Sequence, residues 1–518
     1  MILGDVIERN ARCFGNHPAV IFEGRTTTHA AYAARVRKLI NALAGLGCQR
    51  QDRIAILSRN STEYLEIYGA AALGGFIGVG LNYRLSAIEQ AGILADAEPA
   101  ILIFESEYAG RAAELRAQLP AAVRLICIGP GPDWAQDYEA LVASGADSKP
   151  VLRALPDDTL FLIYTSGTTG TPKGVMLGNE GQLEQACTQA ISHAATQTDR
   201  MLIVMPFYHI GGPTELLTYM VAGATIVLHR TFDAVAILQS IQSERVTAAH
   251  LAPTMILMML EVQENTPFDV SSLHTICYAS APMSVALSKR ARATFGPIFM
   301  QIYGMTEIGL GSTLLKHQHI LDGSAREVGR LASAGQPYLG TDMRIVRDDG
   351  ADCAIGEIGE VWMRAKSLMQ AYWRKPELTR DAIGTGYLRT GDMGFLDDEN
   401  YLFIVDRKKD MVVSGGENIY SREVEEALLL HPAVAEAAVI GAPDPQWGES
   451  VVAVIVRKPG AEVGEEELTA HVRNLIASYK KPKIFQFVDV MPRVTSTNKI
   501  DKRALRAPYW AAHERQVS

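Results

Sequence analysis

Short hydrophobic runs alternate along the chain with longer segments in which apolar residues recur at helical spacing. The segment 29–47 has the helical pattern and ends in Gly45 and Gly47, residues that commonly stop a helix. The hydrophobic runs between such segments are 53–57, 101–104, 125–128, 160–164, 202–205 and 225–228. This alternation predicts an α/β fold built from layers with largely parallel sheets.

The C-terminal part of the chain repeats the alternation on a smaller scale. After a β-like run at 401–406 come a helical pattern, two hydrophobic runs, a second helical pattern and a last run: 421–430, 436–442, 451–456, 465–478 and 485–490. This pattern predicts a compact α+β unit. We therefore expect a large N-terminal domain of layered sheets and helices, 1–405, and a small α+β C-terminal domain, 406–518.

Composition and charge narrow the class of protein without changing this fold. Of the 518 residues, 48% are hydrophobic and 21% are charged, which is the balance of a globular protein. The formal net charge is −9 and no basic stretch suits a phosphate backbone, so we expect no nucleic-acid partner. The negative net charge is still compatible with a nucleotide substrate, because a few local amides and cations bind a triphosphate.

The N-terminus and the cysteines indicate a cytoplasmic protein. Asp5 and Glu8 interrupt the start of the chain, where a secretory signal needs a continuous apolar core. The six cysteines are scattered without a CxxC pair, as free thiols in a reducing compartment are. The most apolar stretch, 65–83, contains Glu66 and many glycines, and it predicts a buried helix passing into a strand. Peripheral membrane association and a homodimer remain open.

The strongest chemical signal is YTSGTTGTPKGV, residues 164–175, directly after a hydrophobic run. Glycines and hydroxyl side chains make a loop that wraps phosphate oxygens, and Lys173 adds a cation. The alternative is a polar surface turn. The loop is not the P-loop of nucleoside triphosphatases, because Gly174 stands where the magnesium-binding hydroxyl would follow the lysine.

Further motifs follow this loop in a fixed order. They are MPFYHIGG (205–212), YGMTE (303–307), YLRTGD (387–392), DRKKDMVVSGGENIY (406–420) and PRVTSTNKIDKR (492–503). With the loop, they resemble the motifs of the adenylate-forming superfamily, which includes acyl-CoA synthetases, luciferases and peptide-synthetase adenylation domains. Each motif alone has an ordinary structural explanation, such as a helix cap for YGMTE or a turn for the Gly-Asp pair, and the ordered set carries the resemblance.

The resemblance implies residues for ATP. Phosphate binding is implied for Thr165, Ser166, Gly167, Thr168, Thr169, Gly170 and Lys173, with a further phosphate contact from Thr306. Glu307 is implied as the ligand of Mg²⁺, which favours carboxylates combined with phosphates. Adenine is implied to lie between the backbone of Ala279, Ser280 and Ala281 and the ring of Tyr303 beside Gly304, and the ribose against Asp392 and Arg407.

The resemblance also implies the chemistry. Lys499 corresponds to the lysine that bridges the acid's carboxylate and the α-phosphate, where a fixed cation offsets the repulsion of two anions. Asn498 replaces the family's usual glycine before it, and asparagine tolerates the left-handed backbone of such a turn. His209 is implied to contact the acyl carboxylate, although a structural histidine fits that position too. A thiol then displaces AMP.

The expected thiol is that of coenzyme A. In the family the small domain rotates between the two half-reactions about the position of Lys409, so that Ser414, Gly415 and Gly416 line the thiol channel. The basic residues Arg84, Lys481 and Lys483 correspond to positions that contact the nucleotide end of CoA, and Trp447 lies near them in sequence. For each of these, an ordinary solvated surface side chain is the alternative.

The acid is the least determined part of the prediction. Gly211, Gly212 and Ala281 are small, which favours room for a ring or an alkyl tunnel, whereas Glu215 adds polarity if its helix face turns inward. We expect a medium- or long-chain fatty acid or an aryl acid of the cinnamate or benzoate type. Transfer to a carrier protein and a non-catalytic nucleotide-binding relative are the alternative functions.

Overall fold

The computed structural model describes residues 1–165, 172–279, 283–415, 417–494 and 499–511. Their contacts group the chain into two compact units, which we call unit 1 (Met1–Met343 and Met363–Leu388) and unit 2 (Arg344–Trp362 and Arg389–Ser518). The α/β class and the division into a larger and a smaller part are as predicted. The expected domain boundary at 405/406 stays a prediction.

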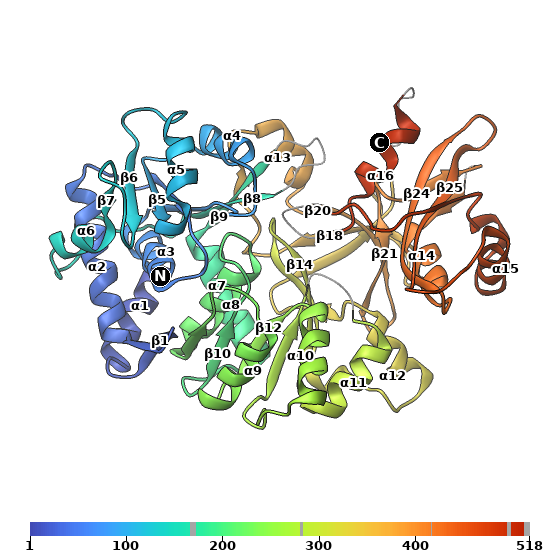
Figure 1. Ribbon diagram of the computed structural model, residues 1–518, viewed down its shortest axis with the longest axis horizontal. Coiled ribbons are helices and arrows are strands. Elements are labelled where there is room, and N and C mark those ends of the chain that lie inside the picture. The colour runs from blue at the N-terminus through green and yellow to red at the C-terminus, as the bar shows by residue number, and fades with distance from the viewer. Residues whose placement is uncertain (166–171, 280–282, 416, 495–498, 512–518) are drawn as a thin grey trace. The chain divides into compact units, whose positions relative to one another are not determined.

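Unit 1 contains two large sheets whose central strands are parallel (Figure 1). The first runs in the order β16 (Gln336–Pro337), β15 (Gly309–Leu314), β14 (Phe299–Met305), β13 (Thr275–Tyr278), β12 (Ala248–Leu251), β10 (Arg200–Ile203), β11 (Thr225–Leu228), β1 (Pro18–Phe22), β2 (Arg25–Thr28). The second runs in the order β19 (Ala371–Tyr372), β9 (Lys173–Gly178), β8 (Thr159–Thr165), β4 (Ile77–Gly80), β3 (Arg53–Leu57), β5 (Ile101–Glu105), β6 (Arg124–Ile128), β7 (Gln136–Asp137). Every hydrophobic run predicted in this part forms a strand.

Helices cover these sheets, which explains why the strands are hydrophobic on both faces. The helices of unit 1 are α1 (Leu3–Cys13), α2 (His29–Gly45), α3 (Thr62–Gly74), α4 (Ala87–Ala97), α5 (Ala109–Arg116), α6 (Tyr138–Ser144), α7 (Asn179–His193), α8 (Gly211–Ala222), α9 (Ala234–Ser243), α10 (Pro253–Asn265), α11 (Val285–Phe295), α12 (Ala325–Gly329) and α13 (Pro376–Ile383). The predicted helix at 29–47 and the helix-to-strand passage in 65–83 are confirmed as α2 and as α3 with β4.

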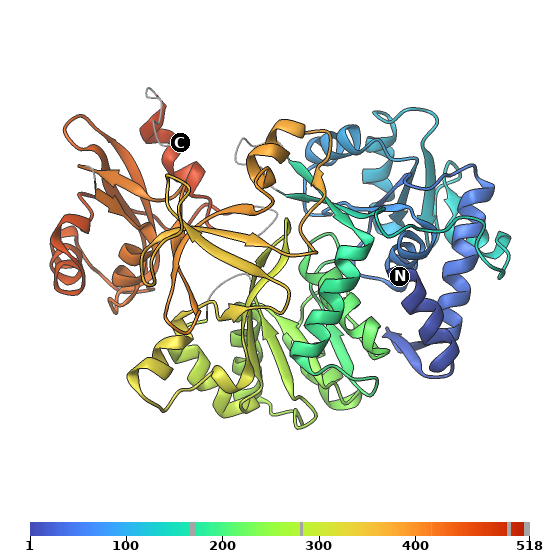
Figure 2. The same ribbon diagram turned by 180° about the vertical axis from the view of Figure 1, so that it is seen from behind.

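Two cores show how the layers hold together. Leu202, Ile256 and Ile276 belong to a core between β10–β14 and the helices α9, α10 and α11. Leu102, Phe104 and their neighbours pack β3, β4 and β5 against α4 and α5. Elsewhere α1, α2 and α3 pack against one another, blue in Figures 1 and 2. None of the helices in the described ranges has both the length and the apolar character needed to cross a bilayer.

Unit 2 contains two sheets, and one of them has a hydrophobic core on each face. One sheet joins β17 (Asp342–Val346), β18 (Gly359–Arg364), β20 (Leu388–Leu396) and β21 (Leu402–Arg407); the other joins β23 (Glu417–Ile419), β22 (Val412–Ser414), β25 (Gly448–Arg457), β24 (Val434–Asp444) and β26 (Ile484–Phe487). Val439 and Ala453 face α14 (Ser421–Leu429) and α15 (Glu465–Leu475), while Ile440 and Val452 face Leu505 of α16 (Lys502–Trp510). The predicted order of helices and strands is confirmed.

Candidate functional site

A strand pair holds the two ends of the glycine-rich loop. β8 and β9 are antiparallel, and Thr165 lies opposite Lys173 at the last pair of the ladder. The predicted phosphate-binding residues Ser166, Gly167, Thr168, Thr169 and Gly170 lie outside the described residues. Because the stem of this hairpin is part of a large sheet, Thr165 and Lys173 are held in fixed positions.

Lys173 belongs to a short chain of contacts that ends at Glu307. The Lys173 ammonium lies 5.1 Å from the centroid of the Tyr372 ring, and the Tyr372 hydroxyl donates to Glu307 Oε1 at 2.9 Å. Tyr372 stands in β19, which pairs with β9 so that Tyr372 is opposite Val175. Burial and then the Glu307 charge raise the pKa of Tyr372 well above its usual value, so the hydroxyl remains a donor.

Tyr372 is a site residue that sequence reasoning missed. Nothing in its immediate sequence marks it, because it reaches the loop only through the pairing of β19 with β9. The backbone fixes Glu307 as well, since its carbonyl accepts from Met369 N at 2.7 Å. The predicted phosphate and magnesium residues Lys173 and Glu307 are thus brought together, with Tyr372 between them.

The predicted adenine-binding residues lie at the ends of neighbouring strands. β13 and β14 are parallel, with Tyr278 opposite Gln301, so Ala279 follows one strand end and Tyr303 with Gly304 forms part of the other. A Cβ on Gly304 would lie 1.8 Å from the Gly309 carbonyl oxygen, so only glycine fits this bulged pairing. Thr306 is buried beyond it. Ser280 and Ala281 lie outside the described residues.

His209 stands between β10 and α8. Its Nδ1 accepts from Gly211 N at 3.3 Å, and its carbonyl accepts from Gly212 N at 3.1 Å, so the turn that begins α8 fixes the ring. A Cβ on Gly212 would lie 2.7 Å from the Pro206 carbonyl oxygen. Gly212 is therefore required by close backbone packing, whereas Gly211 faces His209 and His250.

Behind this turn lies a buried polar cluster that the sequence indicated only at Glu215. The face of α8 that carries Glu215 does turn inward, and its side chain is 1% exposed. Burial raises the pKa of Glu215 to about 8. It lowers the pKa of His250, on β12, to about 4 and that of His193, at the end of α7, to about 3. The cluster is therefore largely neutral at pH 7.

In unit 2 the predicted ribose and adenylation residues form a second group. Asp392 of β20 lies opposite Arg407 of β21, and Arg407 Nε is 2.9 Å from Asp392 Oδ1. Lys499 lies just before Ile500, which pairs with Arg493 in an isolated bridge, and the Lys499 carbonyl accepts from Val494 N at 2.8 Å. Loss of solvation and then the Arg407 charge lower the pKa of Lys499, and the Asp392 charge opposes them. Lys499 thus lies within electrostatic range of both residues.

The predicted hinge residue Lys409 comes just after β21. The pKa of Lys409 is lowered by burial, while the neighbouring Asp410 opposes that effect. Asp410 itself accepts from Arg506 of α16 at 2.7 Å. The chain after Lys409 is therefore tied to the helix that covers one face of the β24–β25 sheet.

Five of the residues predicted for CoA are described on unit 2, and four of them lie at or next to the ring of Trp447. Trp447 is 45% exposed, and its ring lies 5.2 Å from the Lys483 ammonium. Gly415 packs against the same ring, where an added Cβ would lie 2.7 Å from Trp447 Cε3. Ser414 pairs with Gly448 next to this ring, and Lys481 donates to Ser478 O at 3.3 Å. Gly416 lies outside the described residues, and Arg84 belongs to unit 1.

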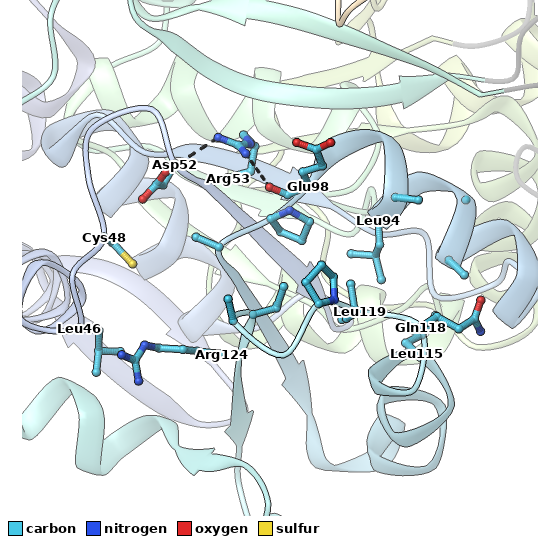
Figure 3. A pocket seen from close by; sticks show the side chains of 18 of the residues that line it. Leu46, Cys48, Asp52, Arg53, Leu94, Glu98, Leu115, Gln118, Leu119 and Arg124 are labelled. Carbon is cyan, nitrogen blue, oxygen red and sulfur yellow. Dashed lines mark hydrogen bonds and ion pairs between the residues drawn. The ribbon is translucent and has the colours of Figure 1, made fainter.

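A cavity of about 930 Å³ elsewhere in unit 1 contains none of the predicted residues. Leucine, alanine and proline side chains from α4, α5 and the start of β6 line it, with Asp52, Arg53, Glu98 and Arg124 at its edges (Figure 3). Arg53 is already engaged there, because its guanidinium donates to the carbonyls of Ala97 and Glu98. This cavity does not share the polar groups of the site.

Comparison with known proteins relates this geometry to characterised sequences. The profile of the AMP-binding enzyme family matches residues 7–373, and that of the AMP-binding enzyme C-terminal domain matches residues 423–499. A feruloyl-CoA synthase of Amycolatopsis sp. is 36% identical over 97% of this chain and 98% of its own. The long-chain-fatty-acid–CoA ligase FadD13 of Mycobacterium tuberculosis is 36% identical over 93% of each chain.

A solved structure resembles the whole chain. The o-succinylbenzoate CoA synthetase (MenE) of Bacillus subtilis, in complex with the acyl-adenylate intermediate OSB-AMP, superposes with a TM-score of 0.84. It is 31% identical and covers 96% of this chain and 97% of its own.

Proposed function

The chain belongs to the AMP-binding enzyme family of adenylate-forming enzymes, and from this premise we propose that it joins a carboxylic acid to coenzyme A through an acyl-adenylate. ATP and the acid give acyl-AMP and pyrophosphate; the CoA thiol then displaces AMP. The observation that supports the proposal is the chain of contacts from Lys173 through Tyr372 to Glu307, which joins a cation and a carboxylate through one tyrosine.

In the first half-reaction, Lys173 and the loop bind the phosphates and Glu307 provides a ligand for Mg²⁺. The residues fit this ion, because Glu307 offers a hard carboxylate oxygen and Tyr372 orients that carboxylate by a hydrogen bond. When bound with ATP, Mg²⁺ would offset the negative charge of the phosphates. Asp392 accepts from the ribose hydroxyls, and Arg407 holds Asp392 in place.

Two further residues act on the acid. His209 faces the carboxylate, and Lys499 brings that carboxylate towards the α-phosphate by offsetting the charge of both groups. Loss of solvation lowers the pKa of Lys499 and leaves the charge of its ammonium form poorly screened. Lys499 has no role in the displacement of AMP.

In the second half-reaction, the domain 406–518 turns about Lys409 and delivers the CoA channel. Ser414, Gly415 and Gly416 line this channel, Trp447 packs on CoA, and Arg84, Lys481 and Lys483 bind its nucleotide end. Support comes from the exposed Trp447 ring, which has Gly415 on one side and the Lys483 ammonium nearby. The six free thiols of the protein agree with a cytoplasmic location.

The acid is of the aryl or fatty type, as in the names of the relatives at 36% identity. The test is a screen of fatty, benzoic and cinnamic acids with ATP, Mg²⁺ and CoA, in which AMP, pyrophosphate and the acyl-CoA are measured together. We expect equal amounts of the three products with at least one acid. AMP formation that depends on neither the acid nor CoA would contradict the proposal. A carrier-protein ligase would instead release pyrophosphate and retain acyl-AMP, with little free AMP and no acylated CoA.

A further inference from the structure

The inward face of α8 carries a hydrogen-bonding site that the proposed chemistry does not use. Glu215 and His250 are 1% and 5% exposed, and His250 Nδ1 lies 3.5 Å from Glu215 Oε1. Glu215 Oε2 and both ring nitrogens of His250 are buried and have no hydrogen-bond partner among the described residues. Buried polar atoms are rarely left so, because desolvation without a partner is costly.

Glu215 is held in position from its other side. Gln189 Nε2 donates to Glu215 Oε1 at 2.7 Å, and Gln189 Oε1 accepts from Thr218 Oγ1 at 2.8 Å. These contacts hold the Gln189 side chain in place and anchor one carboxyl oxygen of Glu215. The second oxygen and the His250 ring are then available to a polar group of suitable size.

This polar site adjoins the residue that faces the acid. A Cβ on Gly211 would lie 3.6 Å from His209 Nδ1 and 3.5 Å from His250 Cε1, so both rings flank the same small residue. Glu215 follows Gly211 by one turn of α8, a rise of about 6 Å. Gly211 thus lies between the rings of His209 and His250, and Glu215 lies one turn further along α8.

We propose that Glu215 and His250 bind a neutral hydroxyl group on the part of the acid remote from its carboxylate, so that hydroxylated acids are the preferred substrates. The inference rests on the proposed function, in which His209 faces the carboxylate. A hydroxyl suits the site because it donates one hydrogen bond and accepts another. Burial keeps Glu215 protonated as a donor and His250 neutral as an acceptor. A second carboxylate would meet another acidic group.

A metal ion is the competing explanation for this cluster. Ligand atoms of His193, Glu215 and Cys277 lie within 4.8 Å of one another. The hydrogen bonds argue against it. Gln189 Nε2 lies 3.4 Å from His193 Nε2, and Cys277 Sγ lies 3.7 Å from both ring nitrogens of His193. The side chains that would bind a metal thus already contact one another, and Gln189 also donates to Glu215 Oε1.

The test compares matched acids with and without the hydroxyl. The pairs are para-hydroxycinnamic against cinnamic acid, and hexanoic acid against its terminally hydroxylated derivative. Calorimetric affinity and kcat/KM for AMP formation with CoA are measured for each. In at least one pair we expect the wild type to prefer the hydroxylated acid about tenfold or more, since a site built for a hydroxyl rejects the analogue that lacks it.

Variants assign the preference to the cluster. Glu215→Leu should reduce it to about twofold or less while the unhydroxylated acid binds as well or better, because no buried carboxyl is then left without a partner. Glu215→Gln should keep part of the preference. Met220→Leu, a volume-conserving change on the same helix, is the control and should keep all of it. If Glu215→Leu does not melt cooperatively, His250→Phe takes its place.

The outcomes separate this inference from the proposed function. Selective binding of a hydroxylated acid without AMP formation would support the polar site and contradict the ligase. AMP formation without a hydroxyl preference, or with a preference that Glu215→Leu and His250→Phe leave intact, would overturn the polar site and keep the ligase. Stoichiometric zinc in the purified protein that Cys277→Ser removes would also overturn it, as would failure of both hydroxylated acids to bind.

Discussion

The charged groups of unit 1 and those of unit 2 are held in different ways. In unit 1, Lys173 and Glu307 meet through the ring and hydroxyl of Tyr372, and all three belong to a sheet or directly follow one of its strands. In unit 2, Asp392 and Arg407 pair across two strands, whereas Lys499 belongs to no strand and lies just before Ile500, which pairs with Arg493 in an isolated bridge. The difference matches their proposed tasks, because the nucleotide must be held throughout whereas Lys499 acts in one half-reaction.

The largest expected effect is that of changing Lys499, and it tests whether this residue acts in the first half-reaction alone. We expect Lys499→Ala to slow acyl-adenylate formation by about 10²–10³-fold, since a fixed charge at the reacting oxygens is lost. Conversion of supplied acyl-AMP to acyl-CoA should change less than about twofold. Pyrophosphate release and thioester formation are measured separately. Lys458→Ala, an exposed lysine in unit 2, is the control. Equal losses in both steps would refute the division.

Glu307→Gln tests the charged groups of unit 1. The loss of a charged magnesium ligand should reduce adenylation by about a hundredfold and shift the Mg²⁺ dependence to higher concentration. A magnesium titration of pyrophosphate release measures both. Glu184→Gln, an exposed glutamate of α7, should change neither. If Glu307→Gln lowered the rate but left the Mg²⁺ dependence unchanged, Glu307 would not be a magnesium ligand.

Tyr372→Phe isolates the contact that holds the unit 1 groups together. The ring over Lys173 stays, while the hydrogen bond to Glu307 is lost, and we expect apparent Mg²⁺ affinity to fall about tenfold, as for other groups that orient a metal ligand. Tyr387→Phe is a matched control, because the Tyr387 hydroxyl also donates to a carboxylate, that of Asp342. Identical behaviour of the two variants would show that Tyr372 has only a structural role.

Trp447→Ala asks whether the exposed ring of unit 2 serves only the second half-reaction. KM for CoA should rise about fivefold through the loss of ring contacts, while pyrophosphate release without CoA stays constant. Steady-state kinetics with CoA as the varied substrate measure this. Trp134→Ala, a tryptophan of unit 1 that stacks on Phe104, should leave KM for CoA unchanged.

The smallest expected effect is a shift in pH dependence. The pKa of Lys499 is lowered, and adenylation needs its charged form, so the adenylation rate should fall with rising pH at a lower pH than an ordinary lysine would give. Lys499→Arg should move that fall to higher pH, because arginine keeps its proton. The profile of pyrophosphate release against pH decides this, and coincident profiles for the two proteins would contradict it.

The sequence predicted those elements whose residues are buried on both faces. β3, β5 and β10 are continuous hydrophobic runs because helices cover each side of their sheets. Tyr372 could not be predicted, because its role depends on pairing with a strand far away in the chain. The cluster around Glu215 escaped for the same reason: His193, His250 and Cys277 come from three other elements, and only the fold brings them together.

The alternation along β24 and β25 restricts how this protein can change over evolutionary time. Val439 and Ala453 point to one core, and Ile440 and Val452 point to the other. Inserting a single residue within either strand would send each side chain beyond it to the wrong core. Length variation is thus tolerated mainly in the connection between the strands, residues 445–447, which includes Trp447. The proposed CoA contact at Trp447 therefore lies in a segment that can vary without rebuilding the interior.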